Sequence, residues 1–400
     1  MKYVVIVGDG MADFPISELN NKTPLEIART PHFDTIAKIG CGGLARNVPK
    51  GMDPASDVAN LSILGYDPKE CYSGRGPLEA IDMGIELQPN QVAFRCNFVT
   101  ISDGMMADYS AGHISNEEGT VLIDLLNKEL GADSVQFYQG MNYRNIVVID
   151  EAKLEDGSGT LHCVPPHDIT GKPINANIPR GKGSEFLIGL MEKAANILGT
   201  CEINKVRIDH GENPANMIWL WGYGKTPQMV SFQERFGVRG AVISAVKLLK
   251  GIGKALKMDV IDVPGATGYY DTNYKGKAEH CLKALSEGCD YVFVHIEAPD
   301  EAGHNGDLTQ KVLAIENIDE HVVKVIMEGI AKYDQYRVLL LPDHYTPLSV
   351  KTHIPDPVPF VMCGSDINAD DMQIMSENEA QKGSCGVVEG HALMDMLIQK

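Results

Sequence analysis

The sequence predicts an α/β protein with a mostly parallel central sheet flanked by helices, and with a smaller α+β domain inserted into it. Short, continuous apolar runs at residues 4–7 and 291–296 are typical of strands that are buried on both faces. Segments with a helical spacing of apolar residues alternate with such runs, and this alternation indicates a parallel sheet. The middle of the chain has separated β-like runs and loops rich in Gly, Pro and Asn, which indicates a second domain.

The expected elements follow in order along the chain. After the strand at residues 4–7, a helix begins near Pro31 and ends at the glycines of residues 40–43. The second half predicts helices at 240–256, 277–285 and 312–332 and strands at 260–263, 291–296, 338–341 and 360–362. The inserted part predicts strands at 92–100, 146–149 and 217–221 and a helix at 185–198. These elements predict a core domain of residues 1–76 and 231–400 and a cap domain of residues 77–230.

The composition favours an acidic metabolic enzyme of the cytoplasm. The chain has 400 residues, 44% of them hydrophobic, which is enough for two cores. A net charge of −19 argues against a nucleic-acid partner, because phosphate backbones attract basic proteins. Nine cysteines without a Cys-x-x-Cys pair indicate free thiols in a reducing compartment. No run approaches the roughly 18 apolar residues of a membrane span, so no membrane partner is expected.

Three clusters of acidic residues and histidines each follow a predicted strand. Asp9 follows the first strand, Asp300 and His304 follow the strand at 291–296, and a third cluster follows 338–341, namely Asp343, His344 and His353. The carboxyl ends of parallel strands meet at one edge of a sheet, so we expect the clusters to meet there. Each cluster alone is also explained by a helix cap or a surface turn. Together their carboxylates and imidazoles are what two divalent ions need.

Ser56 and Arg75 add a second kind of chemistry. Ser56 begins a predicted helix, where it is either an ordinary N-cap or a nucleophile that a bound metal activates. Arg75 lies between two glycines, where its guanidinium could bind a phosphate or carboxylate. The alternative for Arg75 is an exposed hinge between the core and the cap. The spacing of the residues does not decide between these interpretations.

An ordered set of motifs resembles the 2,3-bisphosphoglycerate-independent phosphoglycerate mutases of the alkaline phosphatase superfamily, in their archaeal-type branch. The resemblance covers essentially the whole chain. The motifs that carry it are Gly8-Asp9-Gly10, Pro54-Ala55-Ser56-Asp57, Gly74-Arg75-Gly76-Pro77, Asp300-Glu301-Ala302-Gly303-His304, Pro342-Asp343-His344 and Thr352-His353.

The resemblance implies an alkaline-phosphatase-like core and a glycolytic isomerase that interconverts 2-phosphoglycerate and 3-phosphoglycerate. It implies a phosphoserine intermediate on Ser56 and two divalent ions, Mn²⁺ or Zn²⁺ with Mg²⁺ as an alternative, but no bisphosphoglycerate. The partner would be a small phosphorylated substrate, and the chain would be a monomer or a homo-oligomer. One ion would bind to Asp300, His304 and His353, and the other to Asp9, Asp343 and His344, with Ser56 beside it.

The cap departs from the family pattern. Archaeal-type mutases carry an Asp-Arg-Arg-Ala-Gly-Arg-like segment where this chain has Asp-Tyr-Ser-Ala-Gly-His at residues 108–113. The alternative is therefore a related phosphotransferase acting on another small substrate, such as a homoserine kinase-like enzyme. A metal-stabilised regulatory protein without turnover is a third hypothesis, and Ser56 weighs against it. The predicted substrate-binding residues are Arg75, Arg95, Asn97, His113 and Arg207.

Overall fold

The computed structural model describes residues 1–154 and 161–398, which form two compact units. Unit 1 comprises Met1–Tyr72 and Gln228–Lys400, and unit 2 comprises Ser73–Pro227. The chain thus leaves unit 1 after Tyr72 and returns to it at Gln228. The boundaries predicted from the sequence lie nearby, at residues 76 and 231. Each unit has its own hydrophobic core.

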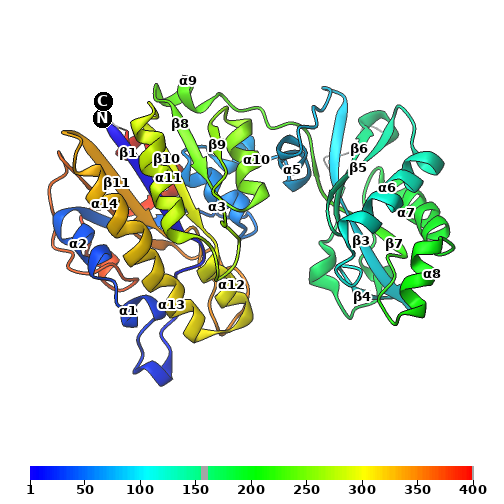
Figure 1. The fold of residues 1–400 in the computed structure, drawn as a ribbon, viewed down its shortest axis with the longest axis horizontal. Helices are drawn as coiled ribbons and strands as arrows, with labels where there is room; N and C mark the ends of the chain where they lie inside the picture. The colour runs from blue at the N-terminus through cyan, green and yellow to red at the C-terminus, as the bar shows by residue number, and fades with distance from the viewer. Residues whose placement is uncertain (155–160, 399–400) are drawn as a thin grey trace. The chain divides into compact units, whose positions relative to one another are not determined.

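The described residues of unit 1 form an eight-stranded sheet in the order β13-β2-β12-β11-β1-β10-β8-β9 (Figure 1). β12 is antiparallel to both of its neighbours, and the other pairings are parallel. The predicted α/β class with a mostly parallel sheet is therefore confirmed. The strands are β1 (Lys2–Gly8), β2 (Cys41–Arg46), β8 (Gly240–Ile243), β9 (Asp259–Ile261), β10 (Tyr291–Ile296), β11 (Tyr336–Leu341), β12 (Val358–Gly364) and β13 (Gly386–Glu389).

Helices cover the sheet because alternate residues of its central strands are apolar toward both faces. Val4 and Ile6 of β1, with their neighbours in β10 and β11, pack against α2, α11, α13 and α14 (Figure 1). Val5 and Val7 point to the other face and are equally buried. The helices of unit 1 are α1 (Pro24–Ile27), α2 (Pro31–Ile39), α3 (Ser56–Ile63), α4 (Pro68–Cys71), α9 (Phe232–Phe236), α10 (Lys247–Ala255), α11 (Tyr274–Ser286), α12 (Ala298–Asn305), α13 (Leu308–Ile318), α14 (Lys324–Ile330) and α15 (Leu393–Leu397).

Three expectations for this unit need correction. The predicted helix at 240–256 is β8 followed by α10, because the run Gly240–Ile243 pairs with β10 and β9. A four-residue apolar run fits either structure, and its neighbours decide which one forms. The glycines after α2 lie partly in β2, a strand that the sequence did not predict. The predicted helix at 312–332 contains a π-helical turn at Asp319–Val323 between α13 and α14.

Unit 2 is an antiparallel sheet with helices on both faces. Its strands run in the order β4-β3-β6-β5, and β7 pairs with the other edge of β3. The larger core lies between this sheet and α6 and α7, and a smaller one lies beneath α5. The elements are α5 (Arg75–Asp82), β3 (Gln91–Ser102), β4 (Met105–Asp108), α6 (Asn116–Leu130), β5 (Val135–Met141), β6 (Arg144–Asp150), α7 (Ser184–Leu198), α8 (Glu202–Asp209) and β7 (Met217–Gly224). Within the described ranges of the chain, no helix combines the length and apolar character that a membrane crossing needs.

Candidate active site and metal centre

The three predicted clusters follow neighbouring strands of the unit 1 sheet. β1 lies between β10 and β11, with Gly8 beside Ile296 and Val7 beside Leu341. Asp9 directly follows β1, Asp300 lies in the first turn of α12 after β10, and Asp343 lies just beyond β11. The fold therefore brings the loops that carry these residues to one edge of the sheet.

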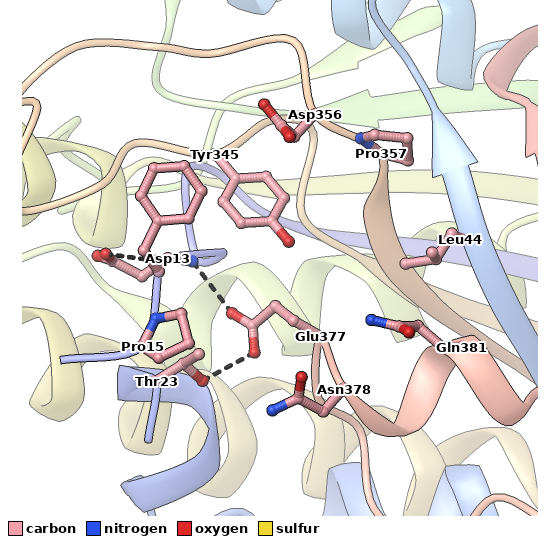
Figure 2. A pocket seen from close by; sticks show the side chains of 11 residues that line it. Asp13, Pro15, Thr23, Leu44, Tyr345, Asp356, Pro357, Glu377, Asn378 and Gln381 are labelled. Atoms are coloured by element: carbon pink, nitrogen blue, oxygen red, sulfur yellow. Dashed lines mark hydrogen bonds between the residues drawn. The ribbon is translucent and has the colours of Figure 1, made fainter. Parts of the chain in front are cut away.

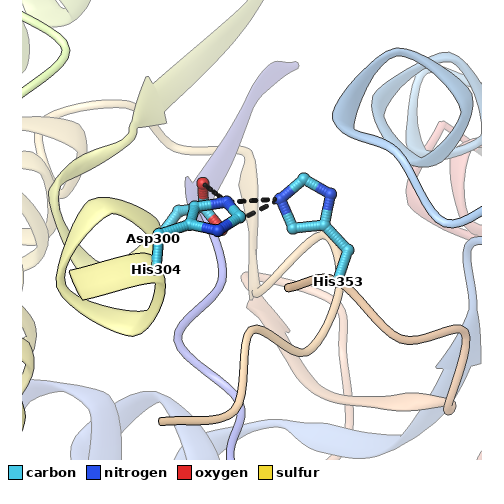
Figure 3. A group of neighbouring side chains, drawn as sticks. All are labelled: Asp300, His304 and His353. Carbon is cyan, nitrogen blue, oxygen red and sulfur yellow. Dashed lines mark hydrogen bonds and ion pairs between the residues drawn. The ribbon is translucent and has the colours of Figure 1, made fainter. Parts of the chain in front are cut away.

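The first group consists of Asp300, His304 and His353 (Figure 3). His304 Nε2 lies 3.2 Å from Asp300 Oδ2, and His353 Nε2 lies 3.3 Å from Asp300 Oδ1. The two Nε2 atoms are 2.9 Å apart. His304 Nδ1 lies 3.0 Å from the carbonyl oxygen of Lys351, to which it can donate its proton. Such a bond leaves the lone pair of Nε2 directed at the group, as in metal-binding histidines.

The second group consists of Asp9, Asp343 and His344, which are at most 1% exposed. His344 Nε2 lies 3.5 Å from Asp9 Oδ1 and 3.5 Å from Asp343 Oδ2. Backbone N–H groups of Gly10 and His344 donate to Asp343 Oδ1, and Asn60 Nδ2 donates to Asp343 Oδ2 at 2.7 Å. The carboxylate of Asp343 is thus fixed in orientation before any ligand binds.

The two groups adjoin each other. The rings of His344 and His353 are 4.0 Å apart between centroids. Asp9, Asp300 and His344 also offer ligand atoms within 4.8 Å of one another. The Thr346 hydroxyl donates to Asp300 Oδ1 and lies 3.2 Å from His344 Nδ1, so it contacts one residue of each group. The arrangement is suited to two cations that lie close to each other, as the two ions of two-metal phosphoryl-transfer sites do.

Ser56 joins the second group. It is the first residue of α3, but the N-cap is Ala55, so the N-cap interpretation of Ser56 does not hold. Its Oγ lies 3.2 Å from His344 Nε2. Asn60 Nδ2 donates both to the Ser56 carbonyl oxygen, at 2.8 Å, and to Asp343, which couples the start of the helix to the carboxylate. The hydroxyl therefore lies among the atoms that would hold an ion.

The charges of the site fit a cation. Burial, followed by the negative charges of Asp343 and Asp300, raises the pKa of Asp9 well above its usual value. Asp9 Oδ1 has no hydrogen-bond partner among the described residues, although it is buried. Burial lowers the pKa of His344 to about 4, so its imidazole is neutral and able to bind a metal. A divalent ion would remove the repulsion between the carboxylates and engage the orphaned oxygen.

Two features hold the loops of the site in place. Gly10 has φ 62°, and a Cβ there would lie 2.7 Å from Asp300 Oδ1, so only glycine fits. The buried Lys311 donates to Asp13 Oδ2 at 2.7 Å and to the Thr346 carbonyl oxygen at 2.8 Å. One ammonium group therefore ties the loop after β1 to the loop after β11.

A cavity of about 260 Å³ lies behind the loop after β1 (Figure 2). Glu377, 7% exposed, lines it and accepts hydrogen bonds from the Asp13 N–H at 3.0 Å and the Thr23 hydroxyl at 2.7 Å. No cation pairs with Glu377 in the part of the chain that the structure describes. Burial raises the pKa of Glu377 to about 7. Its carboxylate supports the loop that carries Asp9.

Glu377→Gln is expected to change the pH dependence of stability. The folded state binds the proton of Glu377 more tightly than the unfolded chain, whose glutamates titrate near 4.5. The free energy of unfolding therefore falls as pH rises from about 4.5 to 7. Over this pH window the free energy of unfolding of the variant should rise relative to that of the wild type by about 1–3 kcal/mol. Urea unfolding across pH measures this gain, with Glu117→Gln on the exposed surface as a control. A difference independent of pH would contradict the assignment.

Three of the five predicted substrate-binding residues lie together in unit 2. The guanidinium groups of Arg75 and Arg95 lie 5.8 Å and 4.4 Å from the ring centre of Trp221. Asn97 accepts a hydrogen bond from Trp221 Nε1 at 3.1 Å. Arg95 is 7% exposed, and its Nε makes no hydrogen bond to the described residues, although Glu79 lies 3.1 Å away. The buried Arg95 and the half-buried Arg75, beside an aromatic ring, are suited to an anion.

Arg207 and His113 lie elsewhere in unit 2. The Arg207 guanidinium contacts Glu118 at 2.9 Å and donates to the carbonyl oxygens of Ala111 and Asn213. Its donors therefore hold the loop before α6. His113 is exposed, with φ 52° and its ring 6.1 Å from that of Tyr143.

The fold brings to these places several residues that were not predicted from the sequence. Asn60 and Thr346 contact the acidic groups directly, and His295 of β10 lies 3.1 Å from Asp9. A histidine in an otherwise apolar strand was a usable signal for His295. The positive charge of Arg144 in β6 is one of the causes that lower the pKa of Arg95. The two residues come close to each other because β6 pairs with β3.

Comparisons with known proteins give the family. Residues 37–204 match a family model described as 2,3-bisphosphoglycerate-independent phosphoglycerate mutase. A protein of that name from Methanothrix thermoacetophila is 52% identical over 399 residues and covers 100% of both chains.

Two solved structures share the fold of the chain. A protein from Pyrococcus horikoshii is 31% identical with a TM-score of 0.82, covering 99% of this chain and 96% of its own. The cofactor-independent phosphoglycerate mutase from Thermoplasma acidophilum is 29% identical with a TM-score of 0.67, covering 100% and 99%. The full-length identity of 52% to the Methanothrix protein is far above what the fold alone would require. The chain belongs to the 2,3-bisphosphoglycerate-independent phosphoglycerate mutase family.

Proposed function

We propose that the chain is a cofactor-independent phosphoglycerate mutase, which interconverts 2-phosphoglycerate and 3-phosphoglycerate through a phosphoserine at Ser56. The observation that carries this proposal is the Ser56 hydroxyl, 3.2 Å from His344 Nε2 beside a buried cluster of carboxylates and imidazoles. A mutase without bisphosphoglycerate needs a protein nucleophile to hold the phosphoryl group while the glycerate reorients. Membership of the family over the whole chain supports the same reaction.

We propose two divalent ions at this centre, Mn²⁺ or Zn²⁺ with Mg²⁺ as an alternative. The mixed oxygen and nitrogen donors suit these ions. When bound, they would lower the pKa of the Ser56 hydroxyl and neutralise charge on the transferred phosphoryl group. The ligands would be Asp300, His304 and His353 for one ion, and Asp9, Asp343, His344 and Ser56 for the other.

The proposed reaction consists of two successive displacements at phosphorus, first onto Ser56 and then back onto the glycerate. Ser56 Oγ gives up its proton and attacks the phosphorus, the bond from phosphorus to the substrate oxygen breaks, and that oxygen takes up a proton. The other hydroxyl of the glycerate then gives up its proton and attacks the phosphorus of phosphoserine, the bond from phosphorus to Ser56 Oγ breaks, and Oγ takes up a proton. The position of Ser56 at the first turn of α3 supports this role, because the positive end of the helix dipole lies there and favours a phosphoryl group.

We propose that unit 2 is the substrate-binding cap. Arg75, Arg95 and Asn97 would hold an anionic group of the substrate, with Arg144 adding positive charge. This extra cation offsets the loss of arginines from residues 108–113, which favours phosphoglycerate over a neutral substrate. Arg207 would act by holding the loop that leads to His113.

Arg75→Lys should lower kcat/KM by about tenfold to a hundredfold, mainly through KM. Lysine keeps the charge but loses the fork that binds two oxygens of an anion, and a hydrogen bond to a charged group contributes about 1.5–3 kcal/mol. Steady-state kinetics with phosphoglycerate measure the change. The control is Arg180→Lys, on the exposed surface of the same unit. Equal kcat/KM in both variants would exclude Arg75 from the substrate site.

A product assay tests the reaction itself. Metal-loaded protein with 3-phosphoglycerate, without ATP and without bisphosphoglycerate, should form 2-phosphoglycerate. A parallel reaction with homoserine and ATP should form no phosphohomoserine. The reverse pattern would replace the mutase proposal with the kinase-like one, and no product in either reaction would favour a role without turnover.

We also propose a cytoplasmic location. All nine cysteines are free thiols, although Cys41 Sγ and Cys385 Sγ lie 3.7 Å apart. Free thiols at such a separation are typical of a reducing compartment.

A further inference from the structure

His295 is a buried histidine whose Nε2 has no hydrogen-bond partner among the residues that the structure describes. It lies near the carboxyl end of β10 and is 0% exposed. Its Nε2 lies 3.1 Å from Asp9 Oδ2, yet it makes no hydrogen bond among the described residues. The direction of the nitrogen therefore does not fit an N–H bond to Asp9. A buried nitrogen without a partner calls for an explanation, and an absent ion is one.

The rest of the His295 side chain is fixed as in a metal ligand. Its Nδ1 lies 3.4 Å from Ser244 Oγ, which also accepts the N–H of Val246 at 3.0 Å. Lys277 Nζ donates to the His295 carbonyl oxygen at 2.9 Å. When Nδ1 donates its proton to Ser244, Nε2 keeps a free lone pair. Metal-binding histidines are held through the second nitrogen in this way.

His295 also completes a set of three donors. Asp9, His295 and Asp343 offer ligand atoms within 4.8 Å of one another, and all three are buried. His295 approaches Asp9 at Oδ2, whereas His344 approaches the same carboxylate at Oδ1. The two imidazoles thus approach different oxygens of one aspartate, and the motifs named from the sequence include only His344 of this pair.

We propose that His295 Nε2 is a further ligand of the divalent ion held by Asp9 and Asp343. This inference rests on the proposed two-metal centre and adds a residue to it. Ser244 is the positioning residue that keeps Nε2 directed at the ion. The number of ions stays at two per chain.

His295→Gln tests the proposal by metal binding. Glutamine keeps a polar side chain but removes the imidazole and its Nε2 lone pair. Competition between the protein and a chelator for Mn²⁺ should show one ion bound at least about tenfold more weakly, with the other unchanged. Ser244→Ala should weaken the same ion by a smaller factor. The control is His280→Gln in α11, whose Nδ1 lies 2.7 Å from the Gly276 carbonyl oxygen, and it should bind both ions as the wild type does.

Thermal unfolding separates loss of the ligand from loss of the fold. Metal-free His295→Gln should unfold near the temperature of the metal-free wild type, while Mn²⁺ should stabilise it less. If His295→Gln does not fold, Ser244→Ala decides by the same measurements. The proposal is overturned if His295→Gln binds both ions with wild-type affinity, or if Ser244→Ala does so when His295→Gln does not fold. That result would leave the proposed mutase function standing. Fewer than two ions in the wild type would instead contradict the two-metal centre itself.

Discussion

Ser56→Ala is expected to lower turnover at least about 10⁴-fold, because the proposed mechanism needs the Ser56 hydroxyl to hold the phosphoryl group between the two displacements. The Ser56 hydroxyl contacts His344, and alanine removes only that oxygen. The fold and the carboxylates of the proposed metal centre should remain in place, because the N-cap of α3 is Ala55. Assays of phosphoglycerate conversion beside metal analysis should therefore show an inactive protein that still binds metal.

Two nearby serines serve as controls for this variant. Ser62 lies in the same helix but is buried, and Ser73 donates to the Lys225 carbonyl oxygen in unit 2. Ser62→Ala and Ser73→Ala should retain wild-type turnover within a small factor. Substantial mutase activity in Ser56→Ala would overturn the mechanism without excluding the metal centre.

Removal of the divalent ions is expected to abolish activity, and Asp300→Asn should reproduce most of this loss. Asp300 contacts His304, His353 and Thr346, so its charge is central to the first group. Asparagine has nearly the same shape but no negative charge, and we expect at least about a 10³-fold loss of kcat/KM. Metal analysis after dialysis should fall from two ions per chain toward one.

The matched control is Asp262→Asn, at an exposed carboxylate paired with Lys250 on the surface. It should bind two ions and retain full activity, since exposed ion pairs contribute little. If activity returns when Mn²⁺ or Zn²⁺ is added back, the loss of activity is due to removal of the ions. Full turnover by protein shown to be free of metal would contradict the two-metal account.

Much of the catalytic edge was predictable because it depends on strand ends. Asp9, Asp300 and Asp343 each follow a continuous apolar run, and parallel strands place such residues together. The placement of the Ser56 hydroxyl was not predictable from its position in the chain alone. The fold makes Ala55 the N-cap and places the Ser56 hydroxyl at His344.

Other features depend on tertiary contacts that no local pattern carries. The run Gly240–Ile243 is a strand because β10 and β9 pair with it, and β2 consists largely of small residues that predict no strand. Lys311 lies just before the predicted helix at 312–332, and no local pattern indicates that its side chain is fully buried against Asp13. Long-range contacts of this kind, including the proximity of Arg144 to Arg95 that follows from the pairing of β6 with β3, have no signature in the spacing of residues.

Mapping the phosphoryl group on the chain tests the central claim most directly. Metal-loaded protein is mixed briefly with 3-phosphoglycerate, quenched in acid, digested and analysed by mass spectrometry. The account predicts a phosphoryl group on Ser56 in the wild type and none on the corresponding peptide of Ser56→Ala. A phosphoryl group on another residue, or product formation with an unmodified chain at every time point, would contradict it.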